Sequence, residues 1–376
     1  MNIKSLFIGA FPYFALPFVI SLVLVPVCKM IGLKLGFYAV ENARTVHHGR
    51  IVRIGGVAIF LAFLISLAVL WAADDTLNGI LIGGFLVFMG GLLDDIYDLR
   101  PRYKLLFQVS GTLIAMIVGK LYLTEIHAFS FVLTSPLITW PIYFFWIVGI
   151  SNAINLIDGL DGLSSGISTI VTLTIGLIGF FMGRRDICIL TLCLSGAILG
   201  FLPYNFHPAS IFVGDCGAQF MGFTIACISL LGFKTTALIT LGLPMLVLFI
   251  PISDTLVAII RRKLKGKRIF EADKGHLHHV LMFKLRLGHR NTVLILYVVT
   301  ALFAAAAILT YMNPRYGIVM ILILLIIADM FMEFTGMINP KWHPMLNILN
   351  RLTGWPRMED GEDPVDTIRI EEEKKN

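Results

Sequence analysis

Four polar side chains recur at every third position in a stretch that directly follows an apolar run of the chain. They are Asn152, Asn155, Asp158 and Asp161. Carboxylates and amides at a membrane boundary are costly to bury, so they normally lie against a partner, an ion or a substrate. Two glycines in the same stretch let a ligand approach the backbone closely. The stretch therefore predicts a functional site, and a polar hairpin without function is the alternative.

Other acids are arranged in ways that suit a cation. Asp94 and Asp95 are adjacent, and adjacent carboxylates repel each other unless a cation or a shared proton relieves them. Asp215 stands between two glycines at the start of a later apolar run. An acid there could bind a metal, because oxygen ligands suit Mg²⁺, or it could cap a helix.

Basic residues and histidines gather in residues 261–291. Ten Lys and Arg side chains accompany a cluster of three histidines, His276, His278 and His279. Such a set predicts an anion site. A zinc site is the alternative for the histidines, and attraction to lipid headgroups accounts for part of the basic run.

Two further features are less specific. Arg53 and other basic residues precede Gly55-Gly56, where the N-terminus of a helix could meet a phosphate. Phe212 is an aromatic residue near the interface. It could stack on a base, or it could simply pack at the membrane surface.

These residues must be positioned by a membrane scaffold. The mean hydropathy is +0.85 and only 14% of the residues are charged, whereas about a quarter is usual in soluble domains. Windows of about 20 apolar residues indicate transmembrane helices. Eleven candidates lie near residues 6–28, 54–73, 79–93, 105–123, 136–151, 163–182, 187–203, 216–231, 235–260, 292–312 and 316–334. The sequence therefore predicts an all-α polytopic membrane protein with about 11 transmembrane helices, the first of them a retained helix and not a signal peptide.

Lys and Arg are distributed unevenly between the two sets of loops. With eleven spans, the loops after odd-numbered helices share one face with the C-terminal segment, and together they hold 24 of the 30 Lys and Arg residues. The positive-inside rule places this face in the cytoplasm and the N-terminus outside. We expect a transmembrane catalytic domain at residues 1–335 and a cytoplasmic tail at residues 336–376.

The polar clusters follow the first, third, fifth, seventh and ninth predicted spans, so all of them lie on this face. Phosphoryl transfer depends mainly on positioning and charge neutralisation. We therefore expect metal-assisted phosphoryl chemistry at the cytoplasmic surface, with one reactant dissolved in the bilayer. A transporter is the main rival, because three acids could line a pathway: Asp254, Asp329 and Glu333. No internal repeat supports a transporter, and a membrane metalloprotease would need an HExxH motif that the chain lacks.

The chain resembles the polyprenyl-phosphate N-acetylhexosamine-1-phosphate transferases of the bacterial envelope over about residues 1–335. Four stretches in the family order carry the resemblance: Asp94-Asp95, Asn152–Leu163, Asn205–Gly217 and His276–His279. The form Asp-Lys-Gly-His-Leu-His-His is similar to the branch that uses UDP-N-acetylglucosamine to begin O-antigen (lipopolysaccharide), enterobacterial common antigen or teichoic-acid linkage synthesis. The peptidoglycan branch, which takes UDP-N-acetylmuramoyl-pentapeptide, usually has three successive histidines and is the alternative. One departure is Val52, where the family commonly has a proline.

The resemblance implies a reaction. Undecaprenyl phosphate would attack the β-phosphorus of UDP-GlcNAc, which gives undecaprenyl-diphospho-GlcNAc and UMP. Mg²⁺, with Mn²⁺ as an alternative, would neutralise charge on the pyrophosphate. The expected setting is a bacterial cytoplasmic membrane. The expected partners are UDP-GlcNAc, undecaprenyl phosphate and the lipid bilayer, without nucleic acid, and a homodimer is one expected oligomeric state.

The resemblance also implies roles for individual residues. The metal would be held by Asp215 with Asn155 beside it. Asp94 and Asp95 would meet the lipid phosphate or its counter-cation, with positioning or acceptance of a proton as their catalytic role, and Lys104 is a candidate partner for the lipid phosphate. The nucleotide side would be formed by Asp158, Asp161, Gly159, Leu160 and Phe212, with Asn205 as a brace. The sugar-phosphate end would contact His276, His278 and His279. Two more substrate-binding residues are expected, Asn152 and Arg53.

Overall fold

The computed structural model describes residues 3–39, 50–71, 74–122, 126–128, 131–133, 135–232, 242–266, 275–338 and 343–353. The chain forms two compact units, Met1–Leu248 and Phe249–Asn376. Part of the predicted basic loop, residues 267–274, and the tail from residue 354 lie outside the described residues.

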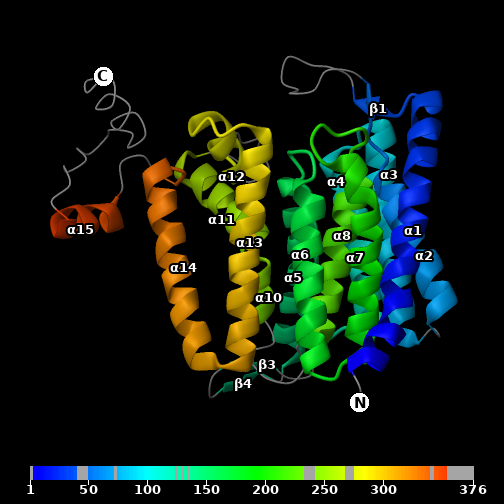
Figure 1. Ribbon diagram of the computed structural model, residues 1–376, viewed down its shortest axis with the longest axis horizontal. Coiled ribbons are helices and arrows are strands. Elements are labelled where there is room, and N and C mark those ends of the chain that lie inside the picture. The colour runs from blue at the N-terminus through cyan, green and yellow to red at the C-terminus, as the bar shows by residue number, and fades with distance from the viewer. Residues whose placement is uncertain are drawn as a thin grey trace. The chain divides into compact units, whose positions relative to one another are not determined.

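The first unit is a bundle of long helices (Figure 1). The helices are α1 Ile3–Leu35, α2 Gly56–Leu70, α3 Asp75–Tyr97, α4 Pro101–Ile117, α5 Pro136–Ile157, α6 Leu163–Phe181, α7 Arg185–Asn205, α8 Gly214–Gly232 and α10 Gly242–Val247. Two short antiparallel hairpins join them. The strands are β1 Tyr38–Ala39 with β2 Ile51–Val52, and β3 Ile126–Ala128 with β4 Phe131–Leu133.

The second unit is also helical. It contains α11 Phe249–Leu264, α12 Leu277–His279, the π-helical turn η1 Val280–Lys284, α13 His289–Met312, α14 Pro314–Thr335 and α15 Pro344–Thr353. The ends of the predicted basic loop are thus structured. Arg261 and Arg262 belong to the last turn of α11, and the histidines begin α12.

Within the described residues, eight helices are long and apolar enough to cross a membrane. This finding confirms the all-α polytopic membrane class. Ten of the eleven predicted intervals coincide with one helix each, while the interval 235–260 coincides with the separate helices α10 and α11. The number of spans and their orientation stay predictions.

Close packing between α3 and α8 brings two of the acidic sequences together. A Cβ atom on Gly91 would lie 2.5 Å from the Cα of Cys216 and 2.6 Å from the carbonyl oxygen of Asp215. Only glycine therefore allows this approach, which is typical of helix contacts in membranes. The last turn of α3, with Asp94 and Asp95, consequently lies against the first turn of α8.

Candidate active site

An ion-pair cluster joins the ends of three helices in the first unit. The Nζ atom of Lys104, in the first turn of α4, lies 2.6 Å from Oδ2 of Asp94 at the end of α3. The same Nζ contacts Oδ2 of Asp215 at the start of α8. Burial lowers the pKa of Lys104, but Asp215 and Asp94 outweigh this effect and raise the pKa above its ordinary value. Lys104 therefore carries a positive charge between two carboxylates.

Asp95 uses its carboxylate differently from Asp94. Its Oδ1 accepts a hydrogen bond from the backbone N–H of Asp215, and its Oδ2 accepts one from the N–H of Cys216, both at 2.9 Å. A carboxylate at this point satisfies amides that a helix N-terminus leaves unpaired and interacts favourably with the helix dipole. Asp95 on α3 thus caps the N-terminus of α8 and holds the backbone of Asp215 in place.

The sharp entry into α8 depends on Gly214. Its φ is +73°, in the left-handed region, where a side chain is strained. A Cβ atom there would also lie 1.8 Å from the carbonyl oxygen of Arg53 and 2.6 Å from Oδ2 of Asp95. Gly214 therefore lets the acidic cluster and the Arg53 segment approach each other.

The Gly55-Gly56 pair has a structural role that the sequence did not reveal. The amide of Gly55 donates to the carbonyl of Phe212 at 3.0 Å, and the amide of Gly56 donates to Val213 at 2.8 Å. These two amides are engaged by the chain itself, so the predicted phosphate contact would need other groups. The guanidinium of Arg53 lies 3.8 Å from Oδ1 of Asp98, and both side chains are exposed.

The end of α5 approaches the start of α8. The hydroxyl of Ser151 donates to the carbonyl of Gln219 at 2.9 Å. Nε1 of Trp146, earlier on α5, donates to the hydroxyl of Ser229, later on α8, at 3.0 Å, so the two helices run in opposite directions. Asn155 follows Ser151 by about one helical turn on α5, and Asp215 precedes Gln219 by about one turn on α8, so both lie about 5.4 Å nearer to the site. The packing of α5 against α8 therefore predicts that Asn155 and Asp215 lie close together.

Asp158 follows at the C-cap of α5. Its Oδ1 accepts a hydrogen bond from the hydroxyl of Ser164. Burial raises the pKa of Asp158 well above its usual range; the Ser164 hydrogen bond opposes this shift, and three nearby negative charges reinforce it. These charges belong to Asp215, Asp95 and Asp161. The structure therefore brings the acids of three predicted motifs into one electrostatic cluster.

Asn152 is paired with a residue on α4. Its Nδ2 donates to Oε1 of Gln108 at 2.9 Å and to the carbonyl of Val148 at 2.8 Å, while its Oδ1 accepts from Nε2 of Gln108 at 3.2 Å. This reciprocal amide pair ties α4 to α5. Gln108 has no role predicted from the sequence, because no local pattern distinguishes it from an ordinary polar residue in a helix.

Asn205 connects the start of α6 to the segment before α8. Its Oδ1 accepts from the amide of Gly162 at 3.1 Å and from the hydroxyl of Ser165 at 2.9 Å. Its Nδ2 donates to the carbonyl of Ile211 at 3.1 Å. These contacts tie the two segments together, and the role of Asn205 toward a nucleotide stays a prediction. Ser165 contributes to this hydrogen-bond network but was not predicted from the sequence.

Asp161 restrains the same segment through its side chain. Its Oδ2 lies 2.9 Å from Nδ1 of His207 and accepts from the amide of Ala209 at 3.1 Å. The half-buried Phe212 follows three residues later. His207 belongs to the stretch Asn205–Gly217, but its link to Asp161 depends on the loop conformation. Between the helices, Gly159 is exposed and Leu160 is buried.

The three predicted histidines lie in the second unit with their rings close together. The ring centroids of His276 and His278 are 5.9 Å apart, and those of His278 and His279 are 4.4 Å apart. Burial, and next the neighbouring His279, lower the pKa of His278 from 6.5 to about 3. His278 is therefore neutral at physiological pH.

Two of the acids that suggested a transporter make local contacts in the second unit. Oδ2 of Asp254 lies 2.8 Å from Nδ1 of His276. The carboxylate of Glu333 accepts from the amides of Met345 at 3.0 Å and Leu346 at 2.9 Å. These contacts give both acids roles inside the fold.

Comparison with known proteins adds an independent line of argument. The model of glycosyl transferase family 4 matches residues 77–233, which include the acidic cluster of the first unit. A Bacillus subtilis (strain 168) protein named probable undecaprenyl-phosphate N-acetylglucosaminyl 1-phosphate transferase is 36% identical over 337 residues, or 88% of this chain and 93% of its own length. A Mycobacterium tuberculosis (strain CDC 1551 / Oshkosh) decaprenyl-phosphate N-acetylglucosaminephosphotransferase is 32% identical over 76% of this chain and 79% of its own length. A Staphylococcus aureus (strain MSSA476) phospho-N-acetylmuramoyl-pentapeptide-transferase is 32% identical over 72% of this chain and 91% of its own length.

Proposed function

Because the chain belongs to glycosyl transferase family 4, among the polyprenyl-phosphate N-acetylhexosamine-1-phosphate transferases, we propose that it transfers N-acetylglucosamine 1-phosphate from UDP-GlcNAc to undecaprenyl phosphate. The products are undecaprenyl-diphospho-GlcNAc and UMP. The B. subtilis relative, whose name contains this acceptor and this sugar, aligns over 93% of its own length. The observation that carries the proposal is the cluster in which Lys104 bridges Asp94 and Asp215.

An oxygen of the lipid phosphate attacks the phosphorus attached to the sugar, and the bond from that phosphorus to the UMP oxygen breaks. A phosphate monoester has a second pKa near 6, so the attacking oxygen is largely deprotonated at neutral pH. Positioning therefore matters more than removal of a proton. Lys104 holds the lipid phosphate, and Asp94 orients Lys104 through the 2.6 Å ion pair.

The cluster also suits a divalent cation. Its acidic groups outnumber its one lysine, and all the candidate ligand atoms are carboxylate or amide oxygens, the donors that Mg²⁺ prefers. Asp215 would hold Mg²⁺, or Mn²⁺, with Asn155 beside it. The bound ion would supply neutralisation of the pyrophosphate charge. Asp95 keeps Asp215 in place for this task through its two hydrogen bonds to α8.

The nucleotide occupies the neighbouring loops. Asp158 and Asp161 flank the turn between α5 and α6, and Gly159 and Leu160 line the uracil pocket. Phe212 stacks on the uracil ring, and its segment is held to α6 by Asn205. Arg53 lies on the adjacent segment, and Asn152 supports the site through its pair with α4.

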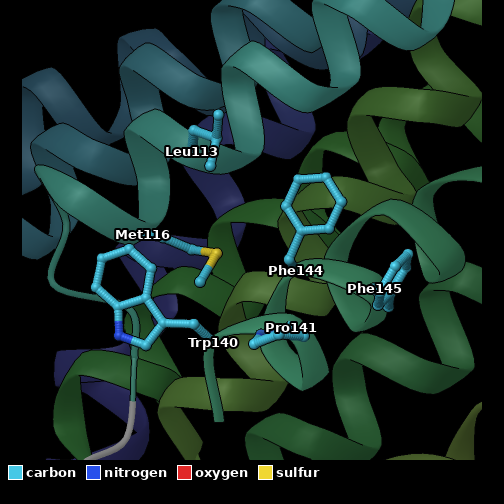
Figure 2. Close-up of a pocket in the computed structure, with 6 residues that line it drawn as sticks. All are labelled: Leu113, Met116, Trp140, Pro141, Phe144 and Phe145. Carbon is cyan, nitrogen blue, oxygen red and sulfur yellow. The ribbon is translucent and has the colours of Figure 1, made fainter. Parts of the chain in front are cut away.

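The polyprenyl chain follows the helices that carry the polar site. An open apolar pocket of about 270 Å³ lies between α4 and α5, and Figure 2 shows the side chains that line it. It is lined by Leu113, Met116, Trp140, Pro141, Phe144 and Phe145. Leu113 lies nine residues after Lys104 on the same helix, about 14 Å along its axis at 1.5 Å per residue. A lipid phosphate at Lys104 could therefore place its chain against this surface.

The remaining assignments follow from the same reaction. His276, His278 and His279 contact the sugar-phosphate end of the donor. The protein resides in the bacterial cytoplasmic membrane with its active site toward the cytoplasm, as the distribution of Lys and Arg favours. The product begins an envelope polysaccharide, and the protein works as a monomer or as a homodimer.

UMP release from the purified protein tests the function. Undecaprenyl phosphate and Mg²⁺ are supplied with each UDP-sugar in turn, and we expect UMP with UDP-GlcNAc. UMP from UDP-N-acetylmuramoyl-pentapeptide alone would replace this function with that of the peptidoglycan branch. UMP from no UDP-N-acetylhexosamine and none from the pentapeptide would refute the transferase proposal altogether.

Paired variants test the site. Asp215→Asn should reduce turnover to background while the protein stays folded. Asp186→Asn is the matched control, because Asp186 pairs with Arg184 at the other end of the helices, and its activity should equal that of the unmodified protein. Full Mg²⁺-dependent activity of Asp215→Asn would contradict the assignment of the metal.

A further inference from the structure

A buried aspartate in the second unit divides its carboxylate between a histidine ring and the backbone. Oδ2 of Asp254 lies 2.8 Å from Nδ1 of His276, and Oδ1 accepts from the amide of Leu277 at 2.7 Å. Asp254 is only 3% exposed and His276 6% exposed. One residue of α11 thus fixes both the ring of His276 and the start of the turn that carries the other histidines.

The contact determines which ring nitrogen bears the proton. An ionised carboxylate is a hydrogen-bond acceptor only, so Nδ1 of His276 must be the donor. In the neutral ring, Nε2 then has a lone pair and accepts hydrogen bonds. An acceptor at Nε2 suits a sugar hydroxyl or the N–H of an acetamido group, whereas a phosphate oxygen requires a donor.

Glu333 shows what a purely structural carboxylate does in the same unit. Both of its oxygens accept from backbone amides, those of Met345 and Leu346 at the start of α15. Asp254 commits only one oxygen to the backbone. Its second oxygen faces an imidazole that is stacked on His278, with the two rings 9° from parallel. The difference points to a role in orienting the ring.

We propose that Asp254 is a positioning residue that holds His276 in the Nδ1–H form, so that Nε2 accepts a hydrogen bond from the N-acetylhexosamine of the donor substrate. This inference rests on the proposed function, in which His276 contacts the sugar-phosphate end. It deepens that function by assigning a recognised group of the substrate, a hydroxyl or the acetamido N–H. It also gives a role to an acid that the sequence placed only in a rival transport pathway.

Asp254→Asn is the direct test. Asparagine can still accept from the amide of Leu277 through Oδ1, but its amide group would donate to Nδ1 and transfer the ring proton to Nε2. Nitrogen NMR of the full-length protein labelled at histidine reports which nitrogen is protonated, and His276→Gln identifies the signal. We expect Nδ1–H in the unmodified protein, Nε2–H in Asp254→Asn and return to Nδ1–H in Asp254→Glu.

Kinetics test the consequence for the substrate. We expect Asp254→Asn to raise KM for UDP-GlcNAc about tenfold, which corresponds to one mismatched hydrogen bond, and to leave KM for undecaprenyl phosphate unchanged. Asp254→Glu should recover part of the loss. Glu333→Gln is the matched control, because the carboxylate that it changes accepts from backbone amides. The contact of Glu333 with the ring of His343 is made by its backbone carbonyl, which the substitution keeps, so KM should not change.

The outcomes separate the two proposals. An unchanged His276 tautomer in Asp254→Asn overturns the positioning role, whatever the activity. If the variant does not fold, Nε2–H in the unmodified protein overturns that role equally well. A changed tautomer with unchanged KM for UDP-GlcNAc overturns the assigned contact to the sugar. Absence of UMP release by the unmodified protein would refute the proposed function, and the NMR result would be independent of it.

Discussion

The carboxylate of Asp95 should be worth more to stability than its position in an acidic pair suggests. Asp95→Ala removes two hydrogen bonds, to the amides of Asp215 and Cys216. Hydrogen bonds to a charged group contribute about 1.5–3 kcal/mol each, which sets an upper bound of about 6 kcal/mol. Loss of the charge also relieves repulsion within the acidic cluster. We therefore expect a net destabilisation of about 2–3 kcal/mol, taking both effects together.

Thermal unfolding in detergent, followed together with UMP release, measures this effect. A loss of this size should lower Tm on the order of 5 °C, and activity should fall because Asp215 is no longer held. Asp95→Asn retains one acceptor oxygen, so its Tm should lie between that of Asp95→Ala and that of the unmodified protein. Asp74→Ala is the control, since Asp74 caps α3 with a single 2.7 Å hydrogen bond to Leu77. It should cost about 1 kcal/mol and leave activity unchanged.

Asp94→Ala provides the contrast within the pair. Asp94 contacts Lys104 and accepts no capping bond from α8 in the contacts described, so its loss should reduce activity with little change in Tm. If Asp95→Ala retained the Tm of the unmodified protein while losing activity, the capping argument would be refuted. Asp95 would then act directly in the chemistry, as the sequence had suggested for both acids.

Three more predictions follow from single features of the structure. Gly214→Ala should abolish activity and lower Tm, because the added Cβ would meet the carbonyl of Arg53 at 1.8 Å. Gly183 has a similar φ of +70° but open space around it, so Gly183→Ala should show only the smaller effect of backbone strain. Equal effects of the two substitutions would contradict the steric argument. Because the pKa of His278 falls from 6.5 to about 3 on folding, the unfolded chain binds its proton more readily, and stability should drop as pH falls below 6.5, by about 2 kcal/mol at pH 5. The Tm difference between pH 7.5 and pH 5 should therefore shrink in His278→Gln, and an unchanged difference would count against the lowered pKa. Lys104→Gln should raise KM for undecaprenyl phosphate at least tenfold, since the cation between Asp94 and Asp215 is lost. An effect on KM for UDP-GlcNAc alone would instead assign Lys104 to the donor substrate.

The membrane class and the motifs could be predicted because they are local properties of the chain. A transmembrane helix requires about 20 apolar residues in succession, so ten of the eleven predicted intervals coincide with single helices. The acids and amides were recognisable because polar groups at the ends of apolar runs are costly. Helix ends shift more easily: α3 begins at Asp75, four residues before the predicted interval 79–93.

The roles within the site could be decided only by the tertiary structure. Asp94 and Asp95 are neighbours in the chain, but successive residues of a helix point about 100° apart. The rotation of α3 therefore directs Asp94 to Lys104 on α4 and Asp95 to the amides of α8. Asp254 likewise meets His276, 22 residues away, because of how a helix and a later turn pack. The sequence by itself determined which residues could do chemistry, and packing decided which of them face one another, since no local pattern records the rotation of one helix against the next.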